Sequence, residues 1–162
     1  LGLAGSTSYT RAHESGTLRL AWRQSGGMIE QCRTPSEAEQ AALPPHMRRP
    51  KVCERRYPDF RVVVRIDGAT SLDRIVEAGG ARKDRAPQLF SSVAVPLGRH
   101  ALSVAVDPML TDAELAASEL VASEHRPLAV DGVVEMEAGA IWRVRPSAAG
   151  ELVLIAPVPA AP

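Results

Sequence analysis

Stretches in which apolar and polar residues alternate one by one recur along this 162-residue chain, separated by Gly, Pro and Asp. Such alternation places every second side chain on one face of a β-strand. In the first stretch, residues 17–23, the large apolar side chains of Leu18, Leu20 and Trp22 share one face. About eight such stretches at this spacing predict a mainly β fold, an antiparallel sandwich with a single buried core.

The other predicted strands follow at regular intervals: 60–67, 72–78, 88–95, 101–106, 128–136, 140–144 and 151–155. Consecutive strands are expected to pair as hairpins. The pair Asp67-Gly68 favours the first of these turns, because a tight hairpin turn needs residues of positive φ. We also expect hairpins of 88–95 with 101–106 and of 128–136 with 140–144. This spacing is typical of an Ig-like sandwich.

Two segments break the alternation and predict short helical insertions. Residues 36–43 lie behind Pro35 and are stopped by a Pro-Pro pair. Residues 111–122 begin with Thr111, and Glu114 three positions later completes a capping box. We therefore assign 17–156 to the sandwich domain, 1–16 to a tether or anchor end, and 157–162 to a Pro- and Ala-rich tail.

The first six residues, Leu-Gly-Leu-Ala-Gly-Ser, resemble the tail of an apolar anchor or the end of a signal peptide. Ser6 stands where a lipoprotein would need Cys, which disfavours a lipid anchor. The alternative is that the sequence starts at an arbitrary residue. We expect an exported protein on the periplasmic side of a bacterial membrane, held by its N-terminal segment.

The two cysteines, Cys32 and Cys53, are separated by 21 positions and flank a Pro-rich segment. Four interpretations are open: a disulfide, two free buried thiols, a metal site that recruits Cys32, Cys53, His46 and His13, or a catalytic thiol. The spacing lacks the CxxC compactness of zinc modules. A disulfide fits an exported chain and would stabilise it by about 3 kcal/mol, so we favour it.

Charge is neutral overall but divided along the chain. Residues 48–65 carry a net charge of +5 and residues 107–137 one of −7, although the whole chain has 19 basic and 19 acidic residues. Zero net charge argues against nucleic-acid binding. We expect protein partners, with these candidate contact residues: Arg48, Arg49, Arg55, Arg56, Arg82, Lys83 and Arg85. A basic surface near a membrane could instead contact anionic lipid headgroups.

No motif for catalysis or for a cofactor is present: there is no phosphate-binding Gly loop, no HExxH and no GxSxG. The four histidines are scattered among predicted loops. We therefore expect no enzyme activity, no cofactor and no metal. Two alternatives remain open. One is a module that binds carbohydrate or a cell-wall polymer, although the chain has only six aromatic residues; the other is a metal-handling domain that uses Cys32, Cys53, His46 and Met47.

Three segments, 13–23, 32–54 and 79–106, together resemble exported bacterial β-sandwich proteins that are tethered to a membrane by one N-terminal anchor. The resemblance covers most of the chain and implies an extracytoplasmic domain; it assigns no functional residues, because none of the three segments is a diagnostic motif. Small sandwiches of this kind occur as accessory subunits of energy-transducing membrane complexes. The expected function is accordingly a non-catalytic accessory subunit of a membrane complex, such as a respiratory or photosynthetic electron-transfer assembly.

Overall fold

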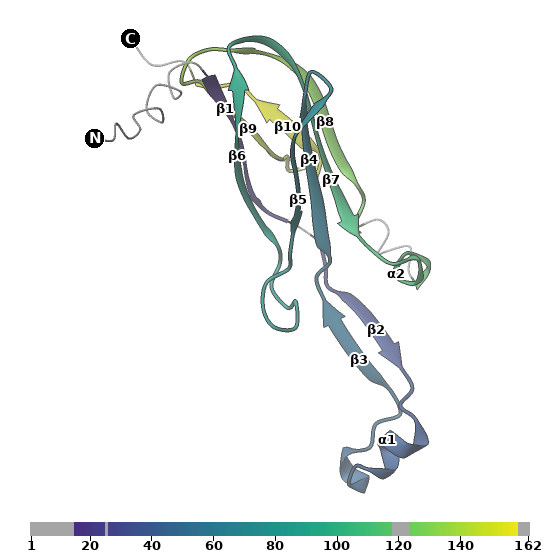
Figure 1. Ribbon diagram of the computed structural model, residues 1–162. Coiled ribbons are helices and arrows are strands. Elements are labelled where there is room, and N and C mark those ends of the chain that lie inside the picture. The colour runs from purple at the N-terminus through teal and green to yellow at the C-terminus, as the bar shows by residue number, and fades with distance from the viewer. Residues whose placement is uncertain (1–14, 25, 118–123, 159–162) are drawn as a thin grey trace, which may run out of the picture.

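Two four-stranded sheets and a separate hairpin make up the fold (Figure 1). The computed structural model describes residues 15–24, 26–117 and 124–158. The first sheet contains β1 (Ser15–Arg23), β6 (Gln88–Pro96), β9 (Ile141–Pro146) and β10 (Leu152–Ile155), in the order β10-β9-β1-β6. The second contains β4 (Asp59–Ile66), β5 (Ala69–Val76), β7 (Gly98–Met109) and β8 (Leu128–Met136), in the order β5-β4-β7-β8.

Both sheets bury one face against a shared core, as the alternation requires. Leu18 and Leu20 of β1 are fully buried, and Val62 and Val64 of β4 contact the same cluster from the second sheet. Trp22 packs against the edge of that cluster. The mainly β, antiparallel sandwich with two short helices is thus confirmed, with one parallel pair, β1 and β9, in the first sheet. The Ig-like connectivity stays a prediction.

The strand partners differ in part from the expected hairpins. β4 and β5 pair as predicted, and Asp67 and Gly68 at their turn both have positive φ. The other two hairpins are wrong: β6 pairs with β1 while β7 pairs with β4 and β8, and β8 and β9 belong to different sheets. The alternation of apolar and polar residues determines which side chains of a strand face the core. The same alternation is expected whichever of the two sheets the strand belongs to. The periodicity therefore left the choice of partner undetermined.

The first helix is shorter than expected, and the second is described only in part. α1 (Glu37–Ala41) begins after Ser36, and a short 3-10 turn, η2 (Pro45–Met47), follows the proline pair. α2 (Asp112–Ala117) lies between β7 and β8. The rest of the second predicted helix falls in 118–123, outside the described residues. Neither described α-helix is long or apolar enough to span a membrane.

The third sheet, a hairpin of β2 (Ile29–Arg33) and β3 (Val52–Arg56), extends away from the end of the sandwich with α1 at its far end (Figure 1). We call residues 29–56 the arm and residues 33–52 its tip. Neither strand pairs with a strand of the two main sheets. The sequence analysis missed both strands because most of their side chains are exposed on both faces and show no alternation.

Candidate docking site

The first part of the tip, where β2 leads into α1, is held by hydrogen bonds of its own polar side chains. The Ser36 hydroxyl accepts a hydrogen bond from the Glu39 amide (3.2 Å), and the Glu39 carboxylate accepts one from the Ser36 amide (2.8 Å). Arg33 at the end of β2 donates two further bonds to Glu39, of 2.9 and 2.8 Å. These hydrogen bonds from Arg33 and Ser36 lower the pKa of Glu39 to about 2. The carboxylate therefore fixes α1 to the end of β2.

The second part of the tip, from α1 to the start of β3, is held by hydrogen bonds from side chains to backbone carbonyls. The Gln40 side-chain amide donates to the carbonyl of Arg49, and Arg48 Nε donates to the carbonyl of Leu43 at 3.0 Å. The proline pair restricts φ and favours the turn between these contacts. No residue of α1 or η2 is buried. Hydrogen bonds and turns, rather than an apolar core, hold the tip together.

An apolar groove of about 590 Å³ runs across the tip. Its apolar lining comes from Pro35, Ala42, Leu43, Met47 and Val52. Leu43 is 41% and Met47 54% exposed, so both present apolar surface to solvent.

Basic residues outnumber acidic ones at and next to this groove. Arg48, Arg49 and Lys51 are exposed, and residues 40–52 include no Asp or Glu. Arg49 and His46 also line the groove itself, as do Arg33 and Glu39, whose charges are paired with each other. The tip therefore offers an apolar patch in a positive field.

Cys32 and Cys53 are directly opposite each other in the β2–β3 register, with an S–S distance of 2.09 Å. The predicted disulfide is therefore present, and it closes the tip on the side of the strands. Glu30 lies near the two sulfurs, and the three ligand atoms fall within 4.8 Å of one another. Two sulfurs joined to each other offer no thiolate to a metal or to a substrate, so the disulfide opposes the free-thiol, metal and catalytic interpretations.

A buried carboxylate stabilises the base of the arm, by which we mean the end where β3 leads into β4. Glu114 of α2 is only 1% exposed and forms an ion pair with Arg56 at the end of β3. Its carboxylate also accepts hydrogen bonds from the Thr111 amide (2.8 Å) and hydroxyl (3.0 Å). Burial alone would raise the pKa of Glu114, but the bonds from Thr111 and Arg56 outweigh it and lower the pKa. Arg56, a candidate partner contact, is thus engaged within the protein.

The loop between β5 and β6 braces the same base. Lys83 forms an ion pair with Asp59, and its carbonyl accepts the Tyr57 amide at 2.8 Å. Arg85 exchanges two backbone hydrogen bonds with Gly79, of 2.9 and 3.0 Å. Lys83, another candidate contact, therefore joins the loop to the start of β4, and the loop is closed by its own backbone.

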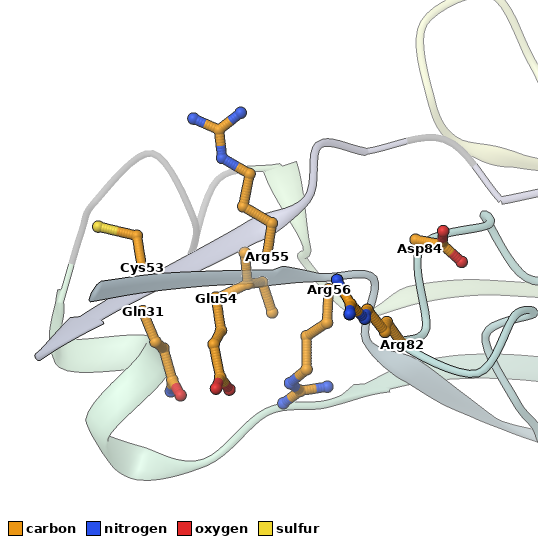
Figure 2. Close-up of a pocket in the computed structure, with 8 residues that line it drawn as sticks. Gln31, Cys53, Glu54, Arg55, Arg56, Arg82 and Asp84 are labelled. Atoms are coloured by element: carbon orange, nitrogen blue, oxygen red, sulfur yellow. The ribbon is translucent and has the colours of Figure 1, made fainter. Parts of the chain in front are cut away.

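Beside the base lies a groove of about 750 Å³ (Figure 2). Its lining includes three of the candidate cations, Arg55, Arg56 and Arg82. These do not converge: Figure 2 shows Arg55 and Arg56 pointing to opposite sides of the hairpin. Arg55 also donates to Glu30 at 2.9 Å. The groove therefore lacks the shared focus that binding one small anion requires.

The seven candidate contact residues thus fall into three groups. Arg48 and Arg49 are at the tip, Arg55, Arg56 and Arg82 line the groove at the base, and Lys83 and Arg85 belong to the bracing loop.

The sequence analysis missed Leu43, the apolar residue of the tip that stands next to the proline pair and ahead of the cations. Trp22 and Trp142 both pack against the core, which leaves neither free as an open platform for a sugar. No protein-family model matches the chain, and no significantly similar curated protein or solved structure was found.

Proposed function

We propose that this chain is a non-catalytic docking subunit that binds a protein partner through the tip of its arm. The observation that carries the proposal is the groove on the tip, an apolar patch within a positive field at the end of an arm. The complementary partner surface carries an apolar side chain that fills the groove and acidic residues around it. A buried apolar anchor with a polar rim is the usual anatomy of a protein interface.

The described polar clusters support a structural role for their charges. Glu39 is bound by Arg33, Glu114 by Arg56 and Asp59 by Lys83. A general base or nucleophile must be free to reach a substrate. Here each carboxylate instead holds two segments of the arm or its base together.

The setting we propose is extracytoplasmic, as an accessory subunit on a bacterial membrane complex. The disulfide is compatible with an oxidising compartment. The class of complex, a respiratory or photosynthetic electron-transfer assembly, rests on the resemblance of segments 13–23, 32–54 and 79–106 to tethered β-sandwich proteins. Attachment through the N-terminal segment belongs to the same proposal.

The test compares two double variants in a mild-detergent membrane extract, analysed by native mass spectrometry with protein identification. Leu43→Ser with Met47→Ser removes the apolar patch of the tip. Ile75→Ser with Val133→Ser is the matched control, since both side chains are about half exposed on the outer face of the second sheet.

We expect the wild type and the control to migrate with the same partner subunits, and the tip variant to lose them. Loss of two central interface side chains typically weakens binding by about tenfold or more. Migration of the wild type alone, or equal retention by both variants, would reject docking through the tip.

A further inference from the structure

The charged side chains on the outer face of the first sheet are all positive. Its outward positions are the alternate residues that point away from the core: Thr17, Arg19, Ala21, Arg23, Gln88, Phe90, Ser92, Ala94, Pro96, Ile141, Arg143, Arg145, Val153 and Ile155. Four of these are Arg, and none is Asp or Glu. We call this surface the arginine face.

Among the described residues these arginines form no ion pair, although Glu135 and Glu137 line a hollow together with Arg143. Arg19 stands beside Arg143 in the parallel β1–β9 register and beside Ser92 on β6. Like charges on neighbouring strands destabilise a sheet. Arg19 Nε is also buried without a hydrogen-bond partner among the described residues. The face thus holds an arrangement that the isolated fold does not favour.

The outer face of the second sheet shows the opposite arrangement. Arg61 donates to Asp73 on the neighbouring strand at 2.9 and 2.6 Å and stands opposite Asp107 in the β4–β7 register. Arg99 stands opposite Glu135 in the same way. The two outer faces belong to one chain of zero net charge, so the single sign of the arginine face is a local property.

Apolar surface accompanies the arginines. Phe90 on β6 is 70% exposed and stands opposite Ala21 on β1. The next outward-facing pair along the same two strands is Arg23 with Gln88. Ile141 and Ile155 also point outward and are partly exposed. An exposed ring among cations can enter the boundary between lipid headgroups and acyl chains, where apolar side chains of interfacial proteins lie.

We propose that the arginine face binds the surface of a bilayer that contains anionic phospholipids. The surface of a partner protein usually mixes both signs of charge, and a matching face would mix them as the second sheet does. An anionic bilayer is negative throughout, so it fits a face that carries only cations and apolar side chains. Four adjacent strands span about 14 Å between the outer two, a broad surface rather than a groove for a single chain.

The test measures cosedimentation of the full chain with vesicles of phosphatidylcholine containing 30 mol% phosphatidylglycerol, and with vesicles of phosphatidylcholine alone. The variant Arg23→Gln, Arg143→Gln, Arg145→Gln removes the three exposed cations of the face and leaves the core untouched. The matched control is Arg48→Gln, Arg49→Gln, Lys51→Gln at the tip, which removes the same charge. Circular dichroism melts verify that both variants fold.

We expect the wild type to bind the anionic vesicles, to ignore the neutral ones, and to be released by 0.5 M salt. The face variant should bind on the order of 100-fold more weakly, since each basic residue at an anionic surface contributes close to a factor of five. Phe90→Ser should weaken binding by about tenfold, and the tip control should keep most of it.

Three results would overturn the proposal: no binding of the wild type to anionic vesicles, equal binding to neutral ones, or equal losses in the face variant and the tip control. A wild type that ignores vesicles but binds poly-glutamate through Arg23, Arg143 and Arg145 would assign the face to an acidic polypeptide and would also contradict it. The outcome is independent of docking through the tip, because the two variants alter separate surfaces.

Discussion

Removing the disulfide should unfold the arm while leaving the sandwich folded. The variant is Cys32→Ser with Cys53→Ser, and both side chains are exposed, so serine fits without a cavity. The arm has little else to hold it: its helical segments bury no residue, and of its two strands only Ile29 is buried. A two-stranded hairpin without such support is marginal in water.

The expected size of the effect follows from the loop that the bond closes. With a sequence separation of 21 residues, the chain-entropy relation gives about 3 kcal/mol of lost stabilisation. Because every 1.4 kcal/mol is a factor of ten, the open form of the arm should become on the order of 100-fold more populated. The cost falls on the arm alone, since β2 and β3 pair only with each other.

Hydrogen exchange followed by mass spectrometry measures this directly. Peptides that cover 29–33 and 52–56 should lose about two orders of magnitude of protection in the variant. Peptides from β4 and β7 should exchange as in the wild type, and the melting temperature of the sandwich should stay within a few degrees.

Two observations would refute the reasoning. Unchanged protection of the arm would show that its hydrogen bonds suffice without the disulfide. An equal loss in β4 and β7 would show that the arm and the sandwich unfold as one unit, so that the base contacts couple them more strongly than the separate pairing of β2 and β3 implies.

Three further outcomes are expected. Glu114→Gln removes the charge that Arg56 and Thr111 stabilise, so the free energy of unfolding should fall by about 1–3 kcal/mol in a urea titration. Burial lowers the pKa of His125; since the unfolded chain binds this proton first, stability should fall as the pH drops below about 6.5, and His125→Gln should flatten that slope in thermal melts. Leu20→Ala should cost about 2–5 kcal/mol with an unchanged denaturant slope.

Local features of the sandwich could be predicted from the sequence because they depend on neighbouring residues. The strand at 128–136 has the predicted bounds, and Asp67-Gly68 forms the predicted turn. Ser36 and Thr111 both make the polar contacts of a helix start with a Glu three positions later. The pairing of β6 and β9 with β1 depends instead on contacts between residues far apart in the chain, and alternation does not encode them.

The candidate site was predicted less well than the fold, for a similar reason. Basic segments such as 48–51 and 82–85 can be recognised in the sequence. Their separation in space cannot, since the first lies at the tip of the arm and the second at its base. The arginine face was invisible because its members come from distant segments, 19–23 and 143–145. Each contributes two cations that only the β1–β9 pairing brings together.

The arm and the arginine face share a property that argues for binding at both. Arg19 beside Arg143 adds repulsion to the sheet, and an arm without a core adds ordered residues with few apolar contacts. Each feature lowers the stability of the isolated chain, and the two proposed contacts would offset this cost: an anionic bilayer would neutralise the arginines, and a partner would cover Leu43 and Met47. The two surfaces share no residue. The loss of binding free energy caused by Leu43→Ser with Met47→Ser and the loss caused by Arg143→Gln should therefore add when the substitutions are combined. A combined loss that exceeds the sum would mean instead that one partner contacts both.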